Sequence, residues 1–164
     1  MENKNNDLLE KVAFAFSYIS IEEMLVADSS YIARSLYATA AEKQSVASMI
    51  ITEDDKQFVE ANITCACVDI VTRLMAYIDA ETQFDSEPYT FVFNLPKGRK
   101  ITIDSLISHE LMRAVSAFIL SRWYDVLLPD MAVRQQQLYE AAVAMVRHDI
   151  FMARGKVARP TSYL

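Results

Sequence analysis

The segment Leu106–Phe151, LISHELMRAVSAFILSRWYDVLLPDMAVRQQQLYEAAVAMVRHDIF, decides the fold class of this chain. Its apolar residues recur every three or four positions, a spacing typical of amphipathic helices. Pro129 and Asp130 divide the segment, because proline disfavours the helical conformation in the residue before it and aspartate is a good N-cap. The pattern therefore predicts two consecutive helices. Their apolar positions are Leu106, Ile107, Leu111, Val115, Phe118, Ile119 and Trp123 in the first helix, and Leu138, Tyr139, Ala142, Val143, Val146, Ile150 and Phe151 in the second.

Three capping-box patterns predict further helices in the N-terminal half. Asp7 with Glu10 predicts a helix from Leu8, and Ser20 with Glu23 predicts a second start, or a bend, near Ile21. Thr52 with Asp55 predicts a long amphipathic helix over about residues 53–80. The polar run Asp28-Ser29-Ser30 could interrupt the second of these stretches, so residues 8–50 are expected to form either two helices or three.

Residues 89–103 predict one β-hairpin. The run Tyr89-Thr90-Phe91-Val92-Phe93-Asn94-Leu95 is rich in strand-favouring residues. Pro96-Lys97-Gly98-Arg99 is typical of a turn, and Lys100-Ile101-Thr102-Ile103 is expected to return as the second strand. A lone hairpin is marginal in water, so it must pack on helices or pair with another chain.

The composition agrees with a mainly α fold. Only two glycines and four prolines occur in 164 residues, which favours long helices over a many-stranded sheet. We therefore expect a single helical domain over residues 1–164, a bundle of four or five helices with the inserted hairpin and an extended tail over about residues 156–164. The predicted core includes Leu74, Ile78, Leu111, Phe118, Val143, Val146 and Ile150.

Charge is distributed unevenly along the chain. Residues 1–82 hold 14 acidic and 6 basic side chains, for −8, and residues 83–164 hold 8 and 10, for +2. The acidic half argues against direct nucleic-acid binding, because phosphate neutralisation needs a basic face. Opposite charges in the two halves would suit head-to-tail contact between copies. No secretory signal and no membrane-spanning stretch is recognisable, so a cytoplasmic protein without membrane contact is expected.

Motifs for catalysis, metal binding and cofactor binding are not recognisable. His109-Glu110 begins like a helical zinc-protease motif, but the second histidine would have to stand where Arg113 is. Cys65 and Cys67 point to nearly opposite sides of a helix, so they cannot share a metal there. The sequence therefore predicts no cofactor, no metal site and no catalytic residue. Carboxylates of different helices could still meet in a cleft, so an enzyme is disfavoured and left open.

Two basic clusters and two pairs of large side chains are the candidate partner contacts. The hairpin tip is cationic and the tail carries further cations beside two terminal apolar side chains. An exposed strand edge can supply main-chain hydrogen bonds, and an extended tail can become ordered on binding. The predicted contact residues are Phe91, Phe93, Lys97, Arg99 and Lys100 in the hairpin, and Arg154, Lys156, Arg159, Tyr163 and Leu164 in the tail.

The C-terminal helices resemble a known group of proteins. The residues concerned are Ile119–Pro129 (ILSRWYDVLLP), Leu138–Ala142 (LYEAA) and Val146–Ile150 (VRHDI). This arrangement resembles small helical neck proteins of tailed bacteriophages, the head–tail connectors, over about 35 residues. The resemblance implies a non-enzymatic, ring-forming adaptor of a virion or prophage particle, with the hairpin and tail as arms between subunits. The alternative is a helical ligand-binding or regulatory domain with an apolar pocket.

Overall fold

One helix, α4 (Ile101–Tyr124), lies at the centre of the molecule. The computed structural model describes residues 8–37 and 48–153, and all structural statements concern these residues. Every residue from Ala114 to Leu120 is buried, so the middle of α4 has no solvent-facing side. A helix that is apolar all round must be covered on every face. Ser116 is the one polar residue in this run, and its hydroxyl donates a hydrogen bond to Asp28 at 2.9 Å.

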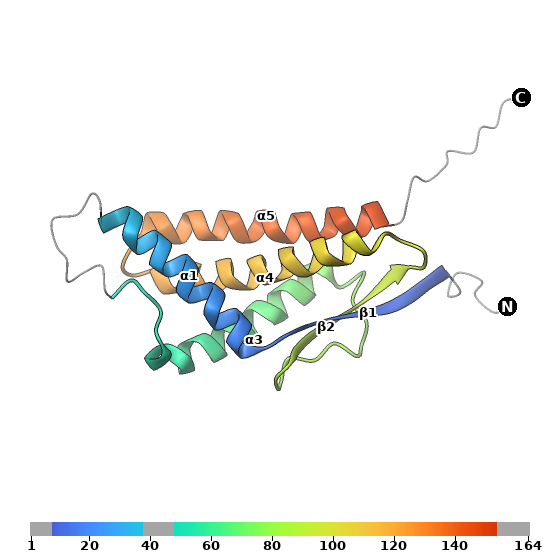
Figure 1. Cartoon of the computed structure of the whole chain (residues 1–164), viewed down its shortest axis with the longest axis horizontal. Coiled ribbons are helices and arrows are strands. Elements are labelled where there is room, and N and C mark those ends of the chain that lie inside the picture. The colour runs from blue at the N-terminus through green and yellow to red at the C-terminus, as the bar shows by residue number, and fades with distance from the viewer. Residues whose placement is uncertain (1–7, 38–47, 154–164) are drawn as a thin grey trace, which may run out of the picture.

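Three other α-helices and a small sheet supply this cover. They are α1 (Tyr18–Tyr37), α3 (Lys56–Leu74) and α5 (Pro129–Ala153), with a 3₁₀ turn, η2 (Glu53–Asp55), before α3. Figure 1 shows α4 and α5 side by side along the long axis, with α1 crossing them and α3 running beneath. The mainly helical class and the bundle of four helices are therefore confirmed for the described residues.

The sheet differs from the predicted hairpin. Strand β2 (Tyr89–Pro96) forms where it was predicted, but its antiparallel partner is β1 (Leu9–Phe16). The register pairs Phe14 with Phe91 and Val12 with Phe93. The prediction of a second strand at Lys100–Ile103 was wrong, because α4 begins at Ile101. The predicted helix from Leu8 was also wrong at its start, since the chain becomes helical only at Tyr18.

A third segment pairs with the other side of β2. The backbone N–H of Asp79 donates to the carbonyl of Val92 at 2.7 Å, and the N–H of Asn94 donates to the carbonyl of Tyr77 at 3.0 Å. Gln83 and Thr90 exchange two further backbone bonds. The helix predicted over residues 53–80 therefore ends at Leu74, because the chain beyond it joins the sheet. β2 is the central strand and β1 lies at the edge.

Aromatic side chains join the sheet to the helices. On the inner face, Phe14 meets Phe93 edge to face with ring centroids 5.7 Å apart, and Phe16 meets Phe91 at 6.2 Å. Six of the seven predicted core residues are buried, and Ile78 is half-buried because it lies in the third segment of the sheet. The N-terminal strand is thus part of the core.

Of the other two predicted helix starts, one is confirmed and one lies three residues away from its predicted position. The capping box of Thr52 and Asp55 is present and begins η2. The N-terminus of α1 is capped by Ser17, whose hydroxyl accepts the N–H of Ser20 at 3.1 Å, so the start is three residues before the predicted one. α1 continues through Asp28-Ser29-Ser30, and the Ser29 hydroxyl accepts the N–H of Ile51 at 3.2 Å. The described part of residues 8–50 therefore contains one α-helix.

The position of β1 predicts a large effect at Phe14 and a small one at Leu8. Phe14→Ala leaves a cavity beside Phe93, and we expect the free energy of unfolding to fall by about 3–5 kcal/mol. Leu8 is 67% exposed just before the strand, so Leu8→Ala is the matched control and should change it by less than about 0.5 kcal/mol. Urea denaturation of the two variants measures both effects. Equal, small losses would show that residues 9–16 do not pack on the core.

Candidate functional site

The outer edge of β1 carries backbone groups that no described residue binds. In an antiparallel pair, residues alternate between those that bond across the pair and those whose backbone groups point away from it. Thr90, Val92 and Asn94 turn their backbone groups toward the segment 77–83, so their register partners Ala15, Ala13 and Lys11 form non-bonded pairs with β2. The N–H and C=O groups of those three β1 residues therefore point outward.

The side chains along this edge leave the backbone accessible. Ala13 and Ala15 are exposed, and their methyl groups are too small to shield the neighbouring N–H and C=O groups. Lys11 extends across the sheet, with its Nζ 3.0 Å from Asp79 and 2.6 Å from Glu81. The hydrogen bonds that Lys11 donates to Glu81 and Asp79 raise its pKa. The lysine therefore points toward the inner strands and does not guard the edge.

Two of the predicted contact residues are in the core. Phe91 and Phe93 have no exposed surface, and their rings are 6.5 Å apart in a cluster that also contains Phe84. We predicted them as contacts because a lone hairpin must pack on helices or pair with another chain. The third segment and the helices instead enclose β2, so these two side chains stabilise the strand and offer no surface to another molecule.

The turn after β2 carries three cations, and they differ in their exposure and in their partners. Arg99 is buried, with its guanidinium bound to Glu10 and, at 2.6 and 2.8 Å, to both oxygens of Asp104. The hydrogen bonds that Arg99 donates to Asp104 contribute most to the raised pKa of Arg99. Lys97 and Lys100 are exposed and have no carboxylate partner among the described residues. Arg99 therefore fixes the turn, while the two lysines remain available for contacts.

The predicted tail contacts lie outside the described residues, which end at Ala153. These are Arg154, Lys156, Arg159, Tyr163 and Leu164. Their role stays a prediction.

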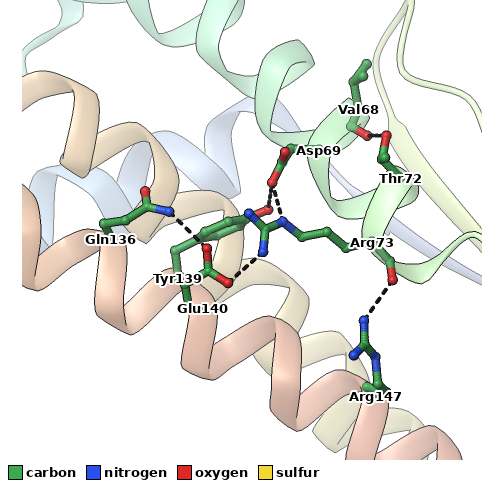
Figure 2. Close-up of polar contacts among 8 residues, drawn as sticks. All are labelled: Val68, Asp69, Thr72, Arg73, Gln136, Tyr139, Glu140 and Arg147. Atoms are coloured by element: carbon green, nitrogen blue, oxygen red, sulfur yellow. Dashed lines mark hydrogen bonds and ion pairs between the residues drawn. The ribbon is translucent and has the colours of Figure 1, made fainter.

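A polar cluster that the sequence did not reveal joins α3 to α5 (Figure 2). The hydroxyl of Tyr139 donates to the carboxylate of Asp69, and the Nε of Arg73 donates to the same carboxylate at 2.7 Å. A second nitrogen of Arg73 reaches Glu140 at 2.6 Å, and Arg147 donates to the backbone carbonyl of Arg73 at 2.9 Å. The spacing of Asp69 and Arg73, four residues apart on one helix, was the one signal available.

Burial and hydrogen bonding set the protonation of this cluster. Burial by itself would raise the pKa of Asp69, but the hydrogen bonds from Tyr139 and Arg73 outweigh it and hold the pKa below its ordinary value. Burial, with the bond to Asp69, raises the pKa of Tyr139. At neutral pH the pair is a carboxylate and a neutral phenol. No proton moves readily between them, so the cluster functions as a clamp between helices.

An open groove of about 840 Å³ runs beside this clamp. Phe58 and Phe118 form its apolar part, and Asn62, Ser121 and Gln136 contribute polar atoms. Arg122 lies over the Phe118 ring at 5.1 Å from its centroid, and its charge helps to lower the pKa of Asp69, which also lines the groove. The groove could hold an elongated ligand or a chain segment with both apolar and polar groups. Its walls do not form the apolar pocket of the alternative prediction.

Metal-ligating side chains do not gather within residues 8–37 and 48–153: no group of three or more that could hold a metal ion is present there. His109 and His148 are both exposed, Cys65 is exposed and Cys67 is buried. Within the same part of the chain, no helix has the length and apolar character needed to cross a membrane.

Comparisons with known proteins identify no relative: no family model, curated protein or solved structure matches this chain.

The clamp predicts a pH-dependent role for Tyr139. Tyr139→Phe removes the hydrogen bond to Asp69, and we expect the free energy of unfolding to fall by about 1 kcal/mol, since Asp69 is partly exposed to solvent. The pKa of Asp69 is lowered in the folded state, so its contribution is complete above its unfolded pKa of about 3.9 and is lost as the pH falls further. The difference between variant and wild type should therefore shrink below about pH 4.

Urea denaturation at several pH values measures this dependence. Tyr31→Phe is the control, because Tyr31 is 76% exposed, and it should show no such trend. A Tyr139→Phe effect that is constant down to pH 2 would contradict the clamp.

Proposed function

We propose that this protein is a non-enzymatic assembly protein that binds neighbouring subunits through the free edge of β1. The observation that carries the proposal is the row of outward-facing backbone groups at Lys11, Ala13 and Ala15. An extended segment that lies along such an edge gains a main-chain hydrogen bond from each of them. Each bond contributes about 1 kcal/mol, so several together with flanking contacts give a specific association.

Among residues 8–37 and 48–153, the edge lacks the features by which proteins usually prevent strand pairing. Such features are proline, a β-bulge, a covering loop or a charge that points outward. β1 contains no proline or glycine, its register with β2 is continuous over eight residues, and its one lysine points toward the inner strands. An edge this open is a liability for a protein that works alone. It suits one whose edge is covered in an assembly.

The proposed occupant is the tail of a neighbouring copy, residues 156–164. Lys156 and Arg159 provide charge, and Tyr163 and Leu164 are apolar anchors. A segment that becomes ordered only on binding can wrap a neighbour over a large surface. This part of the proposal comes from the sequence, and the open edge supplies a place for such a segment.

A finer proposal follows from the resemblance of the C-terminal helices to phage neck proteins. In it, the protein is a head–tail connector-like adaptor, made in the cytoplasm and carried in a virion or prophage particle, where subunits contact one another in a ring. The genes beside this one test it. Portal, capsid, terminase or tail genes would support it, and metabolic or regulatory genes alone would contradict it.

The groove beside α3 favours a second candidate, a helical ligand-binding or regulatory domain. Its supporting observation is Arg122, which stacks on Phe118 and interacts electrostatically with Asp69 in a groove of about 840 Å³ that has both apolar and polar walls. A small molecule retained in native mass spectra of the purified protein would favour this candidate, and a bare chain mass would disfavour it.

Proline at an outward-facing position tests the edge. In Ala13→Pro the lost N–H points away from β2, so the fold should survive, because proline is tolerated at such edge positions. The probe is a labelled synthetic peptide of residues 156–164, added to a chain that ends at Gly155. We expect binding to this chain, and a dissociation constant at least about tenfold higher with Ala13→Pro, as loss of one or two hydrogen bonds implies.

Ala13→Ser is the matched control, since it keeps the N–H and should bind like the parent chain. Circular dichroism of both variants confirms that the helices remain. Equal affinity for the proline and serine variants would contradict docking at the edge, and no binding to the parent chain would remove the tail as its occupant.

A further inference from the structure

An apolar recess rimmed by carboxylates lies on the outer side of α1. Its volume is about 340 Å³, and Val26 and Ala27 form its apolar part. Glu22, Glu23 and Glu53 surround them, the first two from α1 and the third from η2. Glu22 accepts a hydrogen bond from the Tyr18 hydroxyl at 3.1 Å. No described cation pairs with any of the three, so the recess combines an apolar surface with uncompensated negative charge.

A knob of the opposite character stands on the turn between β2 and α4. Ile101, the first residue of α4, is 83% exposed, and the exposed Lys97 and Lys100 precede it in the same turn without a described carboxylate partner. Gly98 and Arg99 fix the conformation of this turn. Gly98 has a φ of 78°, which a residue with a side chain rarely adopts, and the buried Arg99 ties the turn to Asp104 and Glu10. An exposed isoleucine and two lysines that precede it are thus presented together on a well-supported turn.

The two surfaces lie toward opposite ends of the molecule. Figure 1 shows the start of α3, next to η2, at one end and the turn between β2 and α4 at the other. One chain therefore cannot place its own knob in its own recess. We infer that the knob formed by Lys97, Lys100 and Ile101 docks in the Val26–Ala27 recess of a second copy, with the lysines facing Glu23 and Glu53.

Such a contact joins two different surfaces, so it repeats from copy to copy and closes into a ring or continues as an open chain. The inference deepens the proposed function, because it assumes an assembly protein and names a second copy as a partner. It uses neither the β1 edge nor the tail. The contact is small and its charges are exposed, so it should be weak and sensitive to salt.

A charge exchange tests the contact by sedimentation velocity on the full chain. The first variant is Lys97→Glu with Lys100→Glu, and the second is Glu23→Lys with Glu53→Lys. Each alone brings like charges together, so self-association should weaken at least about tenfold. Mixed in equal amounts, the two variants are complementary at every junction, so the mixture should recover assemblies of the wild-type size. Wild-type association should also weaken when the salt rises from about 0.1 M to about 1 M.

Arg34→Glu with Arg134→Glu is the control, because it changes the net charge equally at exposed arginines outside the knob and the recess. It should associate like wild type, and thermal unfolding of every variant confirms folding. Ile101→Ser, which keeps all charges, should also weaken association. A monomeric wild type, unchanged assembly in both exchange variants, or no recovery in the mixture would overturn the inference. Loss with Ala13→Pro but not with the exchange variants would leave the edge proposal standing and remove this one.

Discussion

The buried middle of α4 is the constraint on which the rest of the structure depends. From Ala114 to Leu120 this helix has no face that can meet water, so α1, α3, α5 and the sheet must cover it together. The single polar group in the run is satisfied by Asp28 of α1, which fixes how that helix crosses α4. On the other side, the clamp from Tyr139 and Glu140 to Asp69 and Arg73 joins α5 to α3.

The sheet completes the same core and creates the surface to which we assign a function. β2 must lie inside, because Phe91 and Phe93 pack against the helices and the segment 77–83 occupies its second edge. The remaining place beside β2 is taken by β1, whose inner side chains Phe14 and Phe16 are buried. One edge of β1 is thereby left open. The burial of Phe14 and Phe16 and the exposure of this edge thus have one structural cause, the pairing of β1 with β2.

The helices could be predicted because their apolar residues recur with helical spacing over more than about 15 residues. Strand β1 could not be predicted, because its sequence fits two spacings. Leu8, Val12, Phe16 and Ile19 have helical spacing, but Val12, Phe14 and Phe16 also alternate with Lys11, Ala13 and Ala15 as in a strand. Pairing with a strand about 80 residues away decides between them, and a local pattern carries no such information. The Arg99–Glu10 ion pair and the Asp69–Tyr139 hydrogen bond also join residues far apart in the sequence, so no local pattern predicts them. The exposure of Lys97 and Lys100 was predictable, because charged side chains of a turn usually stay in solvent.

Amide hydrogen exchange along β1, measured by NMR on the dilute protein, tests the central claim most directly. The amides of Val12, Phe14 and Phe16 bond to β2, so they should exchange slowly, while those of Lys11, Ala13 and Ala15 should exchange rapidly. At concentrations where the protein assembles, the second set should become protected as well. Equal protection of both sets in the dilute protein would show that the edge is already covered, and that result would contradict the account.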